Sequence, residues 1–165
     1  MRGTRLARRL LAALGARGWH ISFAESCTGG LIAKLVTDVP GSSSVLLGGC
    51  VTYTNDVKIN LLGVDPAIIE RDTEVSLACA KAMAQGVRER IGACIGVSTT
   101  GYAGPTGGSE RDPVGTVYIA VSTKARTVGE RFSAPEGASR VQVRNAAAKR
   151  ALELVLSFAE NPNNL

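Results

Sequence analysis

Residues 19–41 read WHISFAESCTGGLIAKLVTDVPG. The segment from Trp19 to about Ala24 predicts a strand, because apolar and polar residues alternate along it. The apolar residues from Cys27 to Val39 recur at helical spacing, which predicts a helix that Pro40-Gly41 closes. The turn Glu25-Ser26-Cys27-Thr28-Gly29-Gly30 joins the two. A strand that passes through a polar turn into a helix is the unit from which α/β folds are built.

The sequence on either side continues this pattern. Upstream, Leu6, Leu10, Ala13 and Leu14 predict an amphipathic helix that stops at Gly15. Downstream, the sequence predicts helices over 55–62 and about 75–92, with strands over 45–54, 93–99, 114–123 and 128–133, the last two as a hairpin. A final helix is expected to turn inward Val141, Asn145, Ala148, Leu152 and Val155.

Two internal segments are expected to be loops. One surrounds Asp65-Pro66, and the other spans 100–113, where four glycines and two prolines occur. The length of the second loop suggests a function. The order of elements predicts a three-layer α/β/α fold with a mixed sheet and helices on both faces. We expect one domain over 1–165, with its core over about 5–158 and a frayed tail at 161–165.

Composition and charge limit the function classes. The chain has 165 residues, of which 45% are hydrophobic, so it can bury one sizeable core. Its net charge of +5 derives largely from an arginine cluster that we interpret as the solvated face of the first helix: Arg2, Arg5, Arg8, Arg9 and Arg17. Aromatic residues make up only 4% of the chain, which leaves little material for stacking on bases. Nucleic-acid binding is therefore disfavoured.

The cysteines indicate a reducing compartment and no structural metal. Cys27, Cys50, Cys79 and Cys94 are widely spaced, and the chain has one histidine. This spacing matches no zinc motif and is typical of reduced, buried thiols. No stretch reaches the ~18–20 apolar residues of a membrane span. We expect a cytoplasmic protein that contacts no membrane.

Ser26 is the first candidate for chemistry. A serine between a strand and a helix lies where backbone N–H groups and the helix dipole can stabilise an oxyanion. The alternative is structural, because serine is also a preferred helix N-cap. The neighbouring Cys27 could serve as the nucleophile instead, or it could be a small buried thiol.

A nucleophilic serine needs a base. His20 lies six residues earlier on the same predicted strand, or ~20 Å away, which excludes a Ser-His pair. A buried lysine with a lowered pKa can take this role, and Lys58 is the best-placed one by its sequence context. Asn55 is expected to cap the short helix that carries Lys58. The alternative for Lys58 is an ordinary exposed helix lysine.

A glycine-rich segment spans residues 99–109. Its amides could wrap an anion, or the glycines could simply form a turn. The segment is not a Walker A loop, because Ser109 follows where a lysine is required. A phosphotransferase that uses this loop is therefore disfavoured.

Four ordered motifs resemble the CinA C-terminal domain family. They are Ala24-Glu25-Ser26-Cys27-Thr28-Gly29-Gly30, Tyr53-Thr54-Asn55 with Lys58, Thr100-Gly101-Tyr102-Ala103-Gly104-Pro105 and Pro113-Val114-Gly115-Thr116-Val117-Tyr118. The resemblance runs from about Arg5 to Leu156. It implies a three-layer α/β domain in the stand-alone form of the family, whose deamidases convert nicotinamide mononucleotide and water to nicotinate mononucleotide and ammonia.

The resemblance also implies roles for single residues. Ser26 would be the nucleophile and Lys58 its general base, and no cofactor is implied. The resemblance also implies that Tyr53, Asn55, Thr100 and Arg140 line the site. As a mechanistic hypothesis, we expect backbone N–H groups near Thr28, Gly29 and Gly30 to hold the oxyanion, and we expect Gly101 to contact the substrate. Arg140 and the amides of 106–108 are candidates for binding the nucleotide phosphate. A homodimer is implied as well.

Two points qualify what the resemblance implies. Some family members carry only a competence-protein label, so the alternative function is a non-catalytic binding protein in DNA uptake or repair. The chain also departs from the family at Asp72-Thr73-Glu74-Val75-Ser76, where members often have a Gly-Ala-Val-Ser run. A glutamate therefore replaces a small residue.

Overall fold

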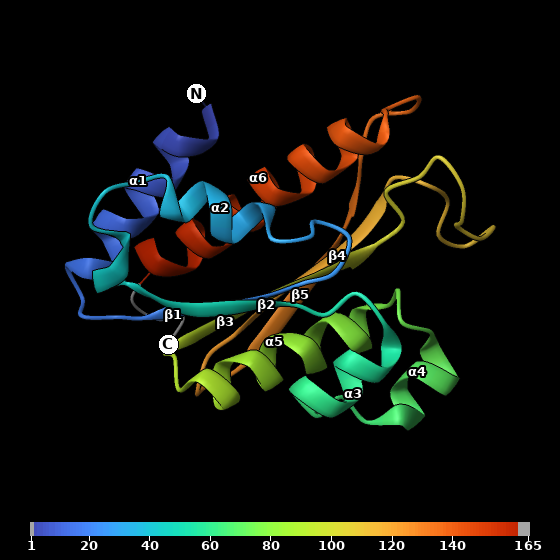
Figure 1. The fold of residues 1–165 in the computed structure, drawn as a ribbon, viewed down its shortest axis with the longest axis horizontal. Helices are drawn as coiled ribbons and strands as arrows, with labels where there is room; N and C mark the ends of the chain where they lie inside the picture. The colour runs from blue at the N-terminus through green and yellow to red at the C-terminus, as the bar shows by residue number, and fades with distance from the viewer. Residues whose placement is uncertain (1, 162–165) are drawn as a thin grey trace.

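The computed structural model describes residues 2–161 and has a five-stranded sheet in the order β2-β1-β3-β4-β5 (Figure 1). β1 pairs in parallel with β2 and β3, whereas β4 pairs antiparallel with β3 and β5. The predicted mixed sheet and C-terminal hairpin are therefore confirmed. The strands are β1 Ile21–Glu25, β2 Leu46–Val51, β3 Ile95–Gly101, β4 Thr116–Ser122 and β5 Thr127–Ser133.

Helices cover both faces of the sheet, as predicted. One face carries α1 Arg2–Gly15, α2 Leu31–Thr37 and α6 Arg140–Glu160, and the other carries α3 Asn55–Leu62, α4 Pro66–Asp72 and α5 Leu77–Ile91 (Figure 1). A short 3-10 helix, η1 Ser42–Ser44, precedes β2.

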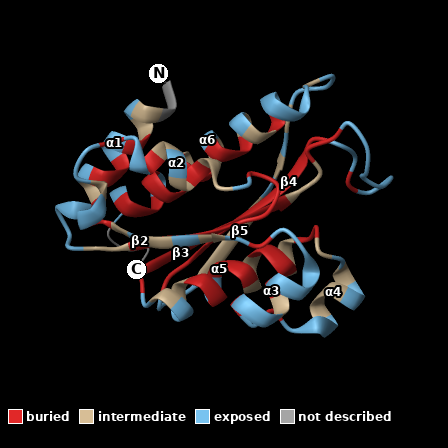
Figure 2. Ribbon diagram, in the orientation of Figure 1, coloured by how far each residue is buried: buried red, intermediate tan, exposed pale blue. Residues whose placement is uncertain are grey.

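The central strands are buried on both faces because helices lie above and below them (Figure 2). Ile21 and Phe23 of β1 belong to the core cluster shared with α1 and α6. Ala24, on the opposite side of the strand, packs with Cys79 and Met83 of α5. β1 therefore joins the two helical layers and passes between them to the turn at Ser26.

Two predictions about helices need correction. The helix expected from Cys27 begins only at Leu31, because Gly29 and Gly30 adopt positive φ angles of 61° and 92° and end the preceding turn. The loop expected around Asp65-Pro66 contains α4. The Asp65 side chain caps this helix by accepting from the N–H of Ala67, and Pro66 occupies its first turn.

The inward face of α6 also differs from the prediction. Val141 is 62% exposed and Asn145 is exposed, whereas Val143 and Ala147 are buried. The buried face therefore begins later in the helix than predicted, and Ala148, Leu152 and Val155 lie on it as expected.

At the chain ends and on the surface, the structure agrees with most predictions made from the sequence. The arginines at positions 5, 8, 9 and 17 are exposed, as expected of a solvated helix face, and Arg9 pairs with Glu160. The tail predicted to fray lies, from residue 162 onward, outside the described residues. Not all cysteines are buried, since Cys94 is exposed and Cys50 is half-buried. Within residues 2–161, no helix is both long and apolar enough to cross a membrane.

Candidate active site

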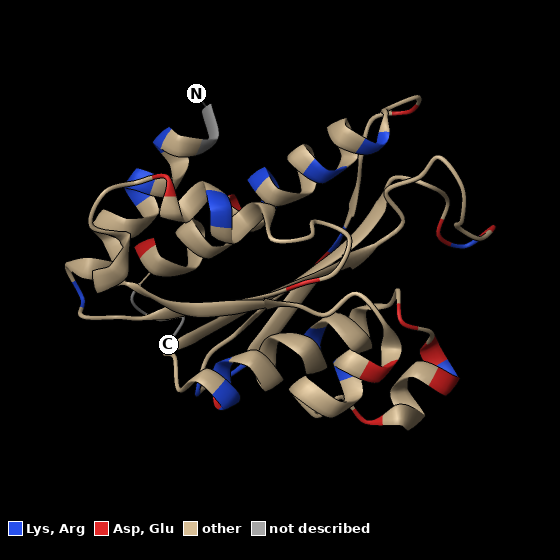
Figure 3. Cartoon of the chain, viewed as in Figure 1, with Lys and Arg blue, Asp and Glu red and all other residues tan. Residues whose placement is uncertain are grey.

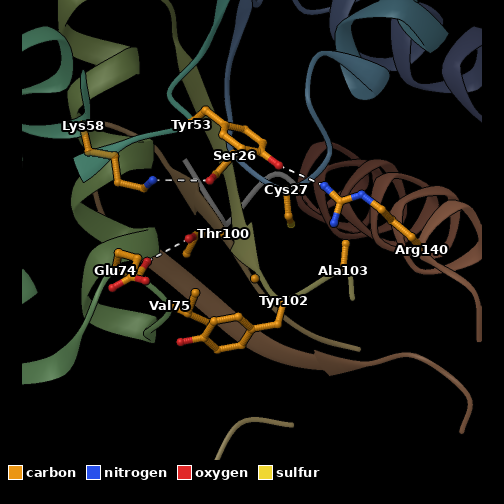
Figure 4. Close-up of a pocket in the computed structure, with 11 residues that line it drawn as sticks. Ser26, Cys27, Tyr53, Lys58, Glu74, Val75, Thr100, Tyr102, Ala103 and Arg140 are labelled. Carbon is orange, nitrogen blue, oxygen red and sulfur yellow. Dashed lines mark hydrogen bonds between the residues drawn. The ribbon is translucent and has the colours of Figure 1, made fainter. Parts of the chain in front are cut away.

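A cavity lies at the carboxyl ends of β1 and β3, where the turn after β1 meets the start of the long loop after β3 (Figure 4). Crevices at this position are common ligand sites in α/β sheets. Its volume is about 190 Å³. It is lined by Ser26, Cys27, Tyr53, Lys58, Glu74, Val75, Thr100, Gly101, Tyr102, Ala103 and Arg140.

Ser26 and Lys58 are in direct contact in this cavity. The Nζ atom of Lys58 donates to Ser26 Oγ at 3.3 Å (Figure 4). It also donates to the carbonyl of Thr52 at 2.9 Å. Lys58 is 1% exposed and Ser26 is 8% exposed. Burial lowers the pKa of Lys58, while the nearby Glu74 carboxylate opposes this effect. The arrangement fits a lysine that can be neutral beside a serine hydroxyl.

The burial of Lys58 follows from how α3 packs. Thr54, and not Asn55 as predicted, caps α3 by accepting from the N–H of Val57. At its other end α3 rests closely on α5, where a Cβ atom at Gly86 would overlap the carbonyl of Leu62. A glycine at this point lets the two helices approach. The Lys58 side chain thereby reaches the carbonyl of Thr52, just after β2, and Ser26 Oγ in the turn after β1.

Ser26 is not a helix cap, so its structural alternative is excluded. The N-cap of α2 is Gly30, which has no side chain to cap the helix. The capping function falls to Glu25, whose buried carboxylate accepts from the backbone N–H groups of Gly30, Ile32 and Ala33 at 2.9–3.1 Å. A carboxylate at a helix N-terminus is favourable because of the helix dipole. Ser26 Oγ therefore remains available for Lys58.

The same contacts correct the expected oxyanion site. The N–H of Gly29 donates to the carbonyl of Ser26, and the N–H of Gly30 donates to Glu25. Both amides are thus already occupied. Within the described part of the chain, the N–H groups of Cys27 and Thr28 have no acceptor on another residue. Cys27 lines the cavity and Thr28 does not, so the N–H of Cys27 is the better backbone candidate for an oxyanion.

Arg144 of α6 holds this turn from outside the cavity. Its Nε donates to the carbonyl of Cys27 at 3.1 Å and its Nη2 donates to the carbonyl of Thr28 at 2.8 Å. In a trans peptide the carbonyl and the following N–H point in opposite directions. The Cys27 contact therefore also fixes the direction of the Thr28 N–H.

Cys27 lacks the properties of a reactive thiol. Burial raises its pKa to about 12, so the thiol stays protonated at neutral pH. It is 6% exposed and belongs to the core cluster beneath α2 and α6. This supports the structural interpretation of Cys27.

Arg140 lies at the mouth of the cavity. Its Nη1 donates to the carbonyl of Gly104 at 2.7 Å and its Nη2 donates to the hydroxyl of Tyr53 at 2.9 Å (Figure 4). It does not cap α6, because Ser139 and Gln142 form a capping box there. Since a guanidinium carries five N–H donors, several remain for an incoming anion.

The cavity brings together six of the ten site residues inferred from the sequence: Ser26, Lys58, Tyr53, Thr100, Gly101 and Arg140. The other four do not line it. Thr28 is buried with its hydroxyl bonded to Thr99, Asn55 is exposed on α3, and Gly29 and Gly30 lie close to Arg144 and Val51, respectively. The amides of 106–108 do not line it either.

Three residues that shape the active site were not predicted from the sequence: Glu25, Glu74 and Arg144. Glu25 and Glu74 both lie in segments singled out in the sequence analysis. The neighbouring residues in the sequence do not reveal how deeply either side chain is buried or which way it points. In residues 2–161, no three His, Cys, Asp or Glu side chains form a group that could hold a metal ion.

Comparison with known proteins identifies the family. Residues 3–159 match the CinA C-terminal domain. CinA-like proteins from Acidobacterium capsulatum and Myxococcus xanthus are 46% and 48% identical over 155 and 147 residues, which cover 93% and 88% of this chain. The aligned regions make up 36% and 34% of the two relatives, so the chain spans about a third of their length.

Solved structures agree. The competence/damage inducible protein CihA from Agrobacterium tumefaciens is 37% identical with a TM-score of 0.92, over 98% of this chain and 97% of its own. A competence-damaged protein (CinA) superfamily member from Escherichia coli is 31% identical with a TM-score of 0.90, over 94% and 90%. The chain therefore belongs to the CinA C-terminal domain family.

Proposed function

We propose that this protein is a metal-independent amidohydrolase that hydrolyses the carboxamide of nicotinamide mononucleotide, giving nicotinate mononucleotide and ammonia. The observation that carries the proposal is the contact between Lys58 Nζ and Ser26 Oγ inside the cavity. A serine paired with a buried lysine is a known arrangement for acyl transfer, and the pKa of this lysine is lowered by burial.

The proposed reaction has two halves. In the first, neutral Lys58 takes the proton of Ser26, and Ser26 Oγ attacks the carboxamide carbon. The tetrahedral oxyanion accepts from the N–H of Cys27, the C–N bond breaks, and the nitrogen leaves as ammonia after it takes the proton from Lys58. In the second, Lys58 takes a proton from water, which attacks the ester carbon. Lys58 then returns this proton to Ser26 Oγ as the ester bond breaks, and the acid product leaves and ionises to the carboxylate.

The cavity volume fits a substrate of which only one end is enclosed. Sites that enclose a whole drug-sized ligand usually have ~300–1,000 Å³, and this cavity has about 190 Å³. It can enclose the pyridine ring with its carboxamide, while the ribose and phosphate extend to the mouth. Arg140 is exposed there and retains free donors, which suits a phosphate.

The direct test is turnover by the purified chain. Incubation with nicotinamide mononucleotide should release ammonia and nicotinate mononucleotide in equal amounts, and the reaction should survive EDTA. Ser26→Ala protein from the same preparation serves as the control for contaminating deamidases. Equal rates in the two proteins, or loss of turnover on chelation that zinc or magnesium restores, would overturn the proposed mechanism.

A further inference from the structure

Glu74 places a carboxylate in the wall of the active-site cavity. It lies in the turn between α4 and α5, is partly exposed, and lines the cavity together with Ser26 and Lys58 (Figure 4). Over residues 2–161, its carboxylate has neither a hydrogen-bond donor nor an ion-pair partner. Apart from its influence on the pKa of Lys58, none of the roles described for this cavity involves Glu74.

The backbone around Glu74 is firmly held while its side chain is not. Thr73 adopts a φ angle of 71°, which is rare for a β-branched residue. The turn is fixed by Ser76 Oγ, which donates to the carbonyl of Thr73 at 2.9 Å, and by Thr100 Oγ1, which donates to the carbonyl of Glu74 at 2.7 Å. Arg111 reaches the same turn at the carbonyls of 72 and 75. These contacts hold Glu74 at the cavity wall.

The cavity consequently has charges of opposite sign at its two sides. In Figure 4, Glu74 and Lys58 lie on one side and Arg140 on the other. Lys58 must be neutral to act as a base, so Glu74 is then the net charge at the reacting end. A neutral substrate that displaced water from this end would leave the carboxylate without a partner, which is unfavourable. A substrate with a cationic ring would compensate it.

We propose that Glu74 makes the site selective for carboxamides carried on a cationic ring, such as an N-substituted pyridinium, over neutral carboxamides of the same shape. The inference rests on the proposed function and specifies its substrate class. In nicotinamide mononucleotide the ring nitrogen is bonded to ribose, so the ring is positive and the phosphate is negative. This order of charges matches Glu74 at the reacting end and Arg140 at the mouth.

The test uses two ligands that differ only in ring charge. One is nicotinamide mononucleotide, and the other is the 5′-monophosphate of its benzamide C-nucleoside analogue, in which a neutral phenyl ring is joined to ribose by a carbon–carbon bond. Their dissociation constants are measured by calorimetry in Ser26→Ala protein, where no turnover occurs. The cationic ligand should bind about ten-fold tighter or more, because charges in a partly enclosed site interact strongly. Adding Glu74→Gln should remove most of this preference, and Glu74→Asp should keep part of it.

Glu70→Gln provides the matched control. It makes the same chemical change at an exposed position on α4, outside the cavity lining, and should leave the preference intact. A Glu74→Gln variant that retains the full preference would overturn the proposal. An equal loss of affinity for both ligands would overturn it too, since Glu74 would then support cavity structure. If Glu74→Gln has no effect but wild-type protein still releases ammonia, only this inference fails. If the preference is found but no ammonia is released, it is the proposed hydrolysis that fails.

Discussion

The Nζ atom of Lys58 lies 3.3 Å from the Oγ atom of Ser26, although 32 residues separate them in the sequence. Pairing of β1 with β2 makes this possible. The N–H of Thr52 donates to the carbonyl of Glu25 at 2.8 Å, which holds the ends of both strands together. The carbonyl of Thr52 in turn accepts from Lys58. Glu25, which precedes the nucleophile, and Thr52, which orients the lysine, are therefore hydrogen-bonded to each other.

Removal of the attacking oxygen should abolish turnover without unfolding the protein. Ser26→Ala deletes only that atom, so we expect no measurable deamidation and an unchanged melting temperature within a few degrees. Cys27→Ala is the adjacent control and should retain activity, because the Cys27 thiol stays protonated. If Cys27 proves essential and Ser26 dispensable, the nucleophile is misassigned.

The lysine should be irreplaceable by another cation. Lys58→Arg should lower kcat nearly as much as Lys58→Ala, because a guanidinium keeps its proton at neutral pH and cannot act as a base. Single-turnover kinetics would measure the chemical step for both variants. An arginine variant with full activity would reduce Lys58 to an electrostatic role.

The pH dependence of kcat/KM should report the titration of Lys58. Burial lowers the pKa of Lys58, and the groups that face it are Cys27 after β1, Glu74 before α5 and Cys79 on α5. Burial raises the pKa of Cys27 to about 12 and that of Cys79 to about 11, so both thiols are uncharged at neutral pH, and the Glu74 carboxylate is the neighbour that raises the pKa of Lys58. Because the base must be neutral, activity should rise with pH through this pKa. Glu74→Gln removes one raising influence, so the acidic limb should move to lower pH. A shift to higher pH would contradict the charge relationship between the two residues.

Arg140 should distinguish nucleotide from nucleoside. If it binds the phosphate, Arg140→Ala should weaken catalysis on the mononucleotide by ~1.5–3 kcal/mol and barely affect nicotinamide riboside. Measuring kcat/KM for both substrates in both proteins gives a double cycle, in which removal of the arginine and of the phosphate should not be additive. Equal losses on both substrates would mean that Arg140 instead supports the loop at Gly104 or the ring of Tyr53.

Arg144 should act on kcat through the turn that carries the nucleophile. Arg144→Ala removes both bonds to the carbonyls of Cys27 and Thr28, and misplacement of this turn should lower kcat by ~10- to 100-fold with little change in KM. Added guanidinium should restore part of the loss. Lys149→Ala, an exposed change on the same helix, is the control. A rise in KM at constant kcat would place Arg144 in substrate binding instead.

Local sequence was sufficient for most of the fold. Helical and strand periodicity, together with stops at Gly15, Pro40 and Gly92, predicted all five strands and five of the six α-helices. The exception is α4, because the sequence around Asp65-Pro66 predicts a loop, although the same pair is also typical of a helix start. The error on α6 was of phase, since Val141 and Asn145 face outward while Val143 and Ala147 face the core.

The sequence by itself determined the elements, their order and the presence of a serine in a strand-to-helix turn, because these depend on residues close together in the chain. Only the tertiary structure decided what surrounds that serine. Burial of Lys58 depends on the pairing of β1 with β2 and on the close contact of α3 with α5 at Gly86. Capping by Glu25, which lies seven residues from Ile32, frees Ser26, and Arg144 reaches the turn from 116 residues away. The charge and reactivity of an ionisable group depend on its burial and its neighbours, which come from distant segments that only folding brings together.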